Sequence, residues 1–293
     1  MSLRINTNVA ALNAYNNLAA NQAKMEGAFS QLSSGLRINK AADDASGLSI
    51  AQGLTSQING LTQAVSNAQD GINVAQIADG ALGTVQNILQ RMRTLVVQAG
   101  NQGTQDQTSL SAIKGEIVNL NTQLDNISKQ TKFGQTNLLD GTYNFNFQVG
   151  ANGNDTISLN LSTANTLSTS LGAATGGQDL TTLKIATDVF DPAAPVAYAS
   201  TDAKADLDAL DKAITQISTA RSTIGAVQNQ LNYTVSNLQT AITNVTASRS
   251  NLTDADLASQ VTAMTQSQIL TQAATAVLAQ ANSAPQAILK LLQ

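Results

Sequence analysis

Apolar residues recur at alternating steps of four and three positions along much of this sequence, and this spacing constrains the fold most strongly. Residues spaced in this way fall on one stripe of an α-helix. When the spacing persists over several heptads, the stripe is typical of helices that pack along their length. The first extended series follows Asp44 and comprises Leu54, Ile58, Leu61, Val65, Ala68, Ile72 and Ala75. It predicts a long helix with a narrow apolar stripe.

The same spacing recurs in four other stretches. Near the beginning it is carried by Leu18, Met25, Phe29 and Leu32. Near the end it is carried by Leu270, Val277, Ile288 and Leu291. Two further series run between residues 110 and 127 and between residues 207 and 245, the latter interrupted by Arg221. No proline precedes Pro192, which allows long helices to persist.

The first long helix has clear boundary signals. Asp43 and Asp44 stand where an N-cap and a first helical turn favour carboxylates, and Gly100 and Gly103 follow the last apolar position. A metal site or an acid pair at Asp43 and Asp44 is the alternative interpretation. Helix capping is the better prediction, because no further carboxylate lies within a turn or two.

The middle of the chain has a different pattern. Apolar residues alternate with polar ones on both sides of a turn-rich segment at 150–155, and they comprise Tyr143, Phe145, Phe147, Val149, Ile157, Leu159 and Leu161. This pattern predicts a β-hairpin. The turn lacks the ligand spacing of a calcium loop. Residues 162–199 are rich in Ser, Thr, Gly and Ala and predict a short surface insertion.

The order of these patterns predicts a mainly α fold. We expect a long antiparallel helical bundle or coiled coil formed by the N- and C-terminal segments, with a small β-hairpin region. Three parts follow from this reading. They are a terminal coiled-coil domain of residues 1–42 with 255–293, a helical rod of 43–161 with 200–254 that carries the hairpin, and the insertion at 162–199.

Composition excludes several classes of function. The chain has no Cys and no His, so the commonest general base, thiol nucleophiles and nitrogen or sulfur metal ligands are absent. We therefore expect no enzyme, no cofactor and no metal. Its 15 basic and 19 acidic residues form no basic stripe, which disfavours nucleic acid as a partner. No apolar run approaches the roughly 18 residues of a membrane span, and no signal-peptide pattern follows Met1.

The terminal segments indicate association between copies. Residues 1–34 and 255–293 contain few bulky side chains and many Ala, Asn, Gln and Thr residues. Such helices approach closely but bury little area, at roughly 25 cal/mol per Å². A two-helix arm of this kind is too small to be stable alone. We expect it to become ordered when other copies surround it, so the sequence predicts a polymer.

Several sequence strings closely resemble bacterial flagellin. They are Ile-Asn-Thr-Asn at 5–8, Gln-Leu-Ser-Ser-Gly-Leu-Arg-Ile-Asn at 31–39, Leu-Leu-Asp-Gly at 138–141, Gln-Val-Gly-Ala-Asn-Gly at 148–153 and Pro-Gln-Ala-Ile-Leu-Lys-Leu-Leu-Gln at 285–293. The resemblance covers about residues 1–160 and 200–293 in order. It implies a short member of the family with a reduced outer region.

The resemblance implies a structural subunit of the extracellular flagellar filament that assembles with copies of itself for swimming motility. It also implies export in an unfolded state through the flagellar type III apparatus, with an export chaperone at residues 255–293. Flagellar cap and hook-associated proteins are further implied partners. A hook–filament junction protein shares the terminal pattern and is the alternative, but the strings near Gln31 and Pro285 favour flagellin.

Two host receptors are also implied by the resemblance. Residues 90–98 are similar to the stretch that the animal toll-like flagellin receptor reads, with Arg91, Leu95 and Glu116 at the contact positions and Thr94 where an acidic residue is usual. Residues 31–51 resemble the peptide that plant receptors bind. From the residues alone, Arg91 belongs to a solvated helix face. Arg221 is expected to extend to the edge of its seam or to pair with an acid on a neighbouring subunit.

Overall fold

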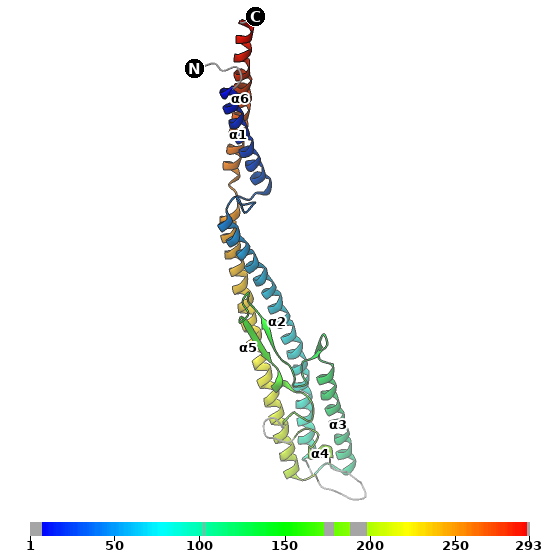
Figure 1. The fold of residues 1–293 in the computed structure, drawn as a ribbon. Coiled ribbons are helices and arrows are strands. Elements are labelled where there is room, and N and C mark those ends of the chain that lie inside the picture. The colour runs from blue at the N-terminus through cyan, green and yellow to red at the C-terminus, as the bar shows by residue number, and fades with distance from the viewer. Residues whose placement is uncertain (1–7, 102, 173–178, 188–197, 292–293) are drawn as a thin grey trace. The chain divides into compact units, whose positions relative to one another are not determined.

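The structure is a computed structural model that describes residues 8–101, 103–172, 179–187 and 198–291, and the side chains of 284–291 lie outside this description (Figure 1). Five long helices dominate it: α1 (Val9–Ser34), α2 (Ala45–Ala99), α3 (Gln107–Gln130), α5 (Ser200–Thr253) and α6 (Leu257–Leu291). The short elements are β1 (Lys132–Phe133), β2 (Thr136–Asn137), β3 (Asn144–Gln148), β4 (Thr156–Asn160), the 3-10 turn η1 (Ser162–Ala164) and α4 (Lys184–Thr187). The predicted mainly α fold is confirmed.

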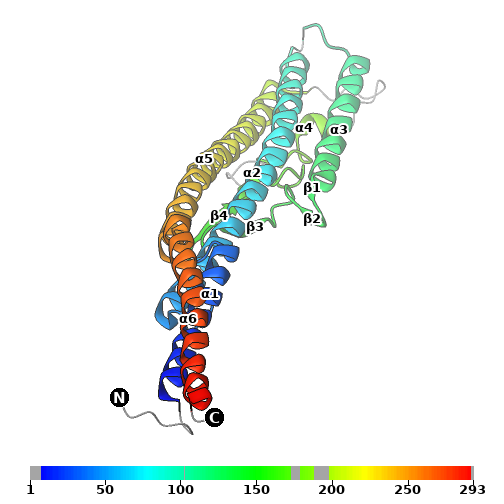
Figure 2. The same ribbon diagram turned by 90° about the horizontal axis from the view of Figure 1, so that it is seen from above.

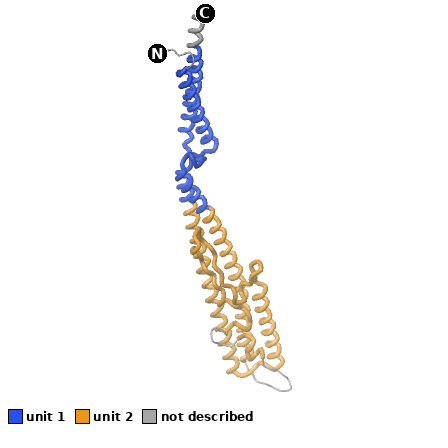
Figure 3. Tube along the Cα trace, viewed as in Figure 1, with its two compact units in different colours: residues 1–58, 243–293 blue, residues 59–242 orange. Residues whose placement is uncertain are grey.

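The chain forms two compact units (Figure 3). Unit 1 comprises residues 1–58 and 243–293, and unit 2 comprises residues 59–242. This division falls within α2 and α5, whereas the sequence placed its boundaries at helix ends near residues 42 and 255. The three-part domain division stays a prediction.

The start of α2 is built by the two predicted carboxylates. The Asp44 carboxylate accepts a hydrogen bond from the Gly47 amide at 2.8 Å, the geometry of an N-cap. The Asp43 carboxylate accepts from the Asn39 and Lys40 amides, both at 2.9 Å, and these bonds lower its pKa. Helix capping is therefore confirmed for Asp44, and Asp43 organises the preceding turn.

Unit 1 pairs α1 with α6 in antiparallel fashion, and both views show the two helices side by side (Figure 2). Asn8, at the start of α1, donates to the Ala281 carbonyl late in α6 at 2.8 Å. At the other end, Leu36 forms a β-bridge with Asp254, just before α6. Gly35 ends α1 with a left-handed φ of 70°, a conformation that favours glycine.

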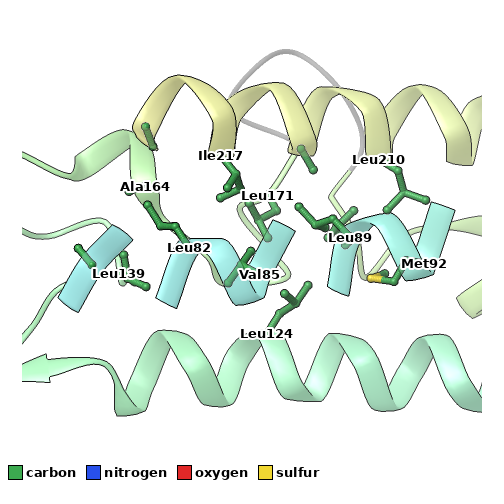
Figure 4. Packing of buried hydrophobic residues seen from close by; sticks show 14 of the residues in the cluster. Leu82, Val85, Leu89, Met92, Leu124, Leu139, Ala164, Leu171, Leu210 and Ile217 are labelled. Atoms are coloured by element: carbon green, nitrogen blue, oxygen red, sulfur yellow. The ribbon is translucent and has the colours of Figure 1, made fainter. Parts of the chain in front are cut away.

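Unit 2 contains a continuous hydrophobic core between α2, α3 and α5 (Figure 4). Its centre consists of side chains with no exposed surface, and those labelled in the close-up are Leu82, Val85, Leu89, Met92, Leu124, Leu139, Ala164, Leu171, Leu210 and Ile217. The heptad stripe of α2 thus meets two other helices and the connecting segments. Each large side chain is enclosed on several sides, and this enclosure supplies the main stabilisation of the unit.

The predicted hairpin is confirmed as the antiparallel pair β3 and β4, with Phe145 opposite Leu159. It packs on α2 at positions that lack side chains. A Cβ added at Gly71 would lie 3.2 Å from Phe147, and one added at Gly60 would lie 3.1 Å from the Ala151 Cβ. Glycine at these positions therefore permits close approach of the hairpin to the helix.

The segment between β4 and α5 differs from the expected surface insertion. Its described part buries Leu171, Leu180, Leu183, Ile185 and Tyr198 in the core of unit 2. These apolar residues follow neither a helical nor a strand period, so the Ser, Thr and Gly content dominated the sequence pattern. The segment is short, but it fills space in the core as well as covering it.

Candidate functional site: the paired terminal helices

The pair of α1 and α6 exposes many large apolar side chains. The exposed members on α1 are Val9, Leu12, Tyr15 and Phe29, and those on α6 are Leu257, Val261, Ile269, Leu270 and Val277. The side chains buried between the helices are small, namely Ala14, Ala28 and Ser267. Two helices cannot enclose more than one narrow stripe each, so the larger apolar side chains remain on the outside.

The predicted seam residues divide into two groups in unit 1. Leu18, Met25 and Leu32 are half-buried, as are Leu54 and Ile58 at the beginning of α2. Phe29 is 63% exposed, and Leu270 and Val277 are exposed as well. These three therefore lie outside the seam. In unit 2, Leu61 is buried and Val65 is half-buried, as the α2 stripe predicts. The side chains of Ile288 and Leu291 lie outside the described residues.

Sequence reasoning missed six of the exposed residues: Val9, Leu12, Tyr15, Leu257, Val261 and Ile269. They lie outside the heptad positions that predict the helix seams. The signal was present, because apolar residues on more than one face of a helix indicate burial by more than one neighbour.

The exposed residues line two shallow apolar grooves. One lies between the helices and is bordered by Met25, Phe29 and Met264, with Glu26 and Gln268 at its rim. The other lies along α6 and is bordered by Val261, Ile269 and Leu270, with polar residues between them. Neither groove gathers a set of polar groups suited to catalysis. Their chemistry is that of a surface which packs against another apolar surface.

The candidate receptor residues lie in unit 2, and the structure brings two of the three together. The Arg91 guanidinium contacts the Glu116 carboxylate at 2.7 Å, joining α2 to α3 at an exposed position. This hydrogen bond raises the pKa of Arg91. The exposed pair carries both charges on the surface, where solvent screens their attraction.

Leu95, which the resemblance places at a receptor contact position, is not exposed in this structure. Its side chain is 2% exposed and belongs to the core of unit 2 with Met92 and Val96. Leu95 continues the buried stripe of α2, three positions after Met92, so it faces α3 and α5 together with that stripe. Exposed apolar side chains on these two helices include Val97 on α2 and Val118 on α3.

Arg221 neither extends freely into solvent nor needs a neighbouring subunit for a partner. It contacts Asp79 of the same chain at 2.8 Å and also donates to the Gln86 side chain at 2.7 Å. This pairing between α5 and α2 raises the pKa of Arg221. Arg93 forms a second pair between the same helices, with Asp211 at 2.7 Å. Both pairs fix the alignment of α2 against α5 within unit 2.

The described residues include no cluster of three or more groups able to hold a metal ion. Within the same residues, no helix is long and apolar enough to cross a bilayer.

Comparison with known proteins decides the family. Residues 5–144 match the family model for the bacterial flagellin N-terminal helical region, and residues 207–292 match that for the C-terminal helical region. The chain is 43% identical to a flagellin of Bacillus subtilis over 99% of its own length and 100% of the relative. This chain belongs to the bacterial flagellin family. It is therefore a subunit of the flagellar filament, a structural protein that associates with copies of itself.

Two other flagellin sequences agree with this assignment. Those of Halalkalibacterium halodurans and Xenorhabdus nematophila are 39% and 41% identical and are covered over 99% and 100% of their lengths. A crystal structure of Bacillus cereus flagellin aligns with 59% of this chain and 88% of its own, at 28% identity and a TM-score of 0.46. The full-length matches favour flagellin over the alternative of a hook-associated protein.

Proposed function

We propose that the exposed apolar side chains of α1 and α6 form the contacts between subunits of the filament. The observation that carries this proposal is that unit 1 buries small side chains and exposes large apolar ones. Ala14 and Ala28 are buried, while Phe29 and Ile269 are exposed. Burying these large side chains against other copies would release roughly 25 cal/mol per Å² of apolar surface. The same helices would contact the cap and hook-associated proteins at the filament ends.

Truncation of one exposed apolar residue tests this proposal. Ile269→Ala removes apolar area on α6, and Gln272→Ala, three positions on, removes a similarly sized exposed polar side chain as the matched control. We expect Ile269→Ala to raise the critical concentration for seeded assembly about tenfold, since roughly 1.4 kcal/mol of lost burial corresponds to that factor. Equal critical concentrations for the two variants would contradict the proposal.

We further propose that the chain is exported unfolded through the flagellar type III apparatus and that a chaperone covers α6 beforehand. The support is again the exposed apolar surface of α6, which an isolated subunit would present to solvent and to other proteins. A chaperone that packs on this helix would delay polymerisation until secretion. The Ile269→Ala variant would then also bind the purified flagellar chaperone more weakly than the Gln272→Ala variant in a titration.

Host recognition is a second candidate function, favoured by the exposed pair of Arg91 and Glu116. We propose that the animal toll-like receptor contacts this pair, because Arg91 offers a planar set of donors at the surface. Leu95 would support the contact from within the core by holding α2 in place. The plant receptor would bind the stretch at 31–51, where Asp43 and Asp44 shape the turn.

A receptor-reporter assay separates a direct contact from a structural effect. Arg91→Ala should shift the dose–response curve to higher concentrations. The control is Arg93→Ala, which removes the neighbouring exposed pair with Asp211. Loss of the response in both variants together would indicate general damage to unit 2. An unchanged curve for Arg91→Ala would refute the contact.

A further inference from the structure

The sequence contains two Asn–Gly pairs, Asn59–Gly60 and Asn152–Gly153. This dipeptide is chemically labile because the glycine amide nitrogen attacks the preceding asparagine side chain with no β-carbon to hinder it. Both asparagines are exposed in the structure. Their reactivity therefore depends on the glycine amide and on the freedom of the backbone, and the two sites differ in both respects.

The Asn152–Gly153 pair lies in the turn that joins β3 to β4. Space around Gly153 is open, since a Cβ placed there would meet no heavy atom within 4 Å. Within the described part of the chain, the Gly153 amide has no hydrogen-bond acceptor. The nucleophilic nitrogen is thus uncommitted. The Asn152 carbonyl of the same peptide group accepts hydrogen bonds from the Asp155 amide and the Gln148 side chain, so attack requires these bonds within a short turn to open.

The Asn59–Gly60 pair lies inside α2, where backbone amides take part in the helical hydrogen-bond ladder. Close packing adds a second restraint, because a Cβ at Gly60 would lie 3.1 Å from that of Ala151. Attack by the Gly60 nitrogen therefore requires the helix to open and the hairpin to move away. Within one unit of the molecule, the same dipeptide thus lies once inside a packed helix and once in a short turn.

We propose that Asn152 is a site of spontaneous deamidation that ages the hairpin turn. The Gly153 nitrogen loses its proton to water or hydroxide and forms a bond to the side-chain carbonyl carbon of Asn152. The bond from that carbon to the amide nitrogen breaks, and ammonia leaves with the transferred proton. Water then opens the resulting succinimide at either carbonyl, which yields aspartate or isoaspartate at position 152. No oxidant or reductant is involved.

The product disturbs the contacts that hold the turn. The Asn152 side-chain amide donates to the Asp155 carboxylate at 3.2 Å, and the Asn152 backbone amide donates to the same oxygen at 3.3 Å. Replacing the amide with a second carboxylate substitutes like-charge repulsion for that hydrogen bond. Isoaspartate also lengthens the backbone beside Ala151, which touches Gly60 of α2. The modification thus loosens the hairpin where it meets the helix.

Ageing the full-length protein in mildly alkaline buffer tests the proposal. Peptide mapping by mass spectrometry measures the amide-to-acid conversion at each Asn–Gly pair, and an isoaspartate-specific methyltransferase labels the product. We expect conversion at Asn152 to exceed that at Asn59 by more than about tenfold, since an opening cost of 1.4 kcal/mol at the helix site already gives that factor. In concentrated denaturant the two rates should become equal, because both pairs then share the same dipeptide chemistry.

Two variants complete the design. Gly153→Ala fits the open space and the backbone at that position, so the hairpin should form normally while conversion at Asn152 slows several-fold. Asn152→Gln should abolish the methyltransferase label in the corresponding peptide. The proposal is overturned if Asn152 in the native chain reacts no faster than Asn59, or if Gly153→Ala leaves its rate unchanged.

Discussion

The two units of this chain carry the same apolar repeat but differ in whether their large apolar side chains are buried. In unit 2, the stripe of α2 faces α3 and α5 together, and leucines such as Leu82 and Leu89 have no exposed surface. In unit 1, α1 has α6 as its long partner, the buried contacts include Ala14 and Ala28, and large side chains such as Phe29 lie outside. A heptad stripe thus specifies that a helix packs, while the number of neighbours determines whether large residues are enclosed.

The difference between the two units gives a physical reason why a member of this family associates with copies of itself. A unit that encloses its large residues is stable as a monomer, whereas a unit that exposes them gains stability from other copies. We therefore expect unit 2 to be the independently stable part of the subunit and unit 1 to contribute to assembly. Three experiments test this division of roles.

Removal of α6 should have the largest effect. A chain lacking residues 255–293 loses the exposed apolar side chains of α6 but none of the core of unit 2. Seeded assembly should be abolished, as measured by light scattering and electron microscopy. Circular dichroism should show that most helicity of residues 43–250 is retained. Loss of the whole helical signal would show that α6 belongs to the folding core. It would contradict the different roles assigned to the two units.

Core and surface leucines provide the second test. Leu89→Ala should lower the free energy of unfolding by about 2–5 kcal/mol, because it leaves a cavity in the closed core of unit 2. Leu270→Ala is the matched control, since the same truncation on exposed α6 should change monomer stability by about 0.5 kcal/mol or less. Urea unfolding followed by circular dichroism measures both. Similar losses would mean that unit 1 is also stabilised by enclosed packing in the monomer.

Much of this architecture was predictable from sequence. The helix periods, the cap at Asp44, the end of α2 before Gly100 and the β3–β4 hairpin all depend on local patterns, and all were confirmed. Exposure was harder to predict, because it depends on which elements meet. Leu95 and Phe29 show this best, since both occupy helical positions whose burial is set by distant segments.

The pairing of charges could not be predicted from the sequence either. Arg221 could be placed on the α5 seam, but its partner Asp79 lies 142 positions away, and only the alignment of two helices brings them together. The buried residues of the segment after β4 were missed for a related reason. They follow no regular period, so their burial is set by the space between the packed helices and not by a sequence repeat.

A buried carboxylate in unit 2 offers the test with the smallest expected effect and the most specific one. Asp206 at the beginning of α5 has no exposed surface and accepts hydrogen bonds from the Lys184 and Ile185 amides and from the Tyr198 hydroxyl at 2.7–2.9 Å. Burial raises its pKa above the ordinary value of 3.8, although these hydrogen bonds oppose the shift, and the nearby Asp202 adds to it. The carboxylate ties the segment after β4 to α5.

The sign of the pH effect follows from the raised pKa. The folded state binds the proton more tightly than the unfolded state, so this contribution to stability is complete below pH 3.8 and is lost as pH rises through the folded pKa. Asp206→Asn should remove that slope and cost about 1–3 kcal/mol, because an amide group replaces one acceptor facing buried donors. Urea unfolding at a series of pH values measures both quantities. Asp208→Asn, which changes an exposed carboxylate on the same helix, serves as the control, and an identical slope in all three proteins would show that Asp206 does not titrate with folding.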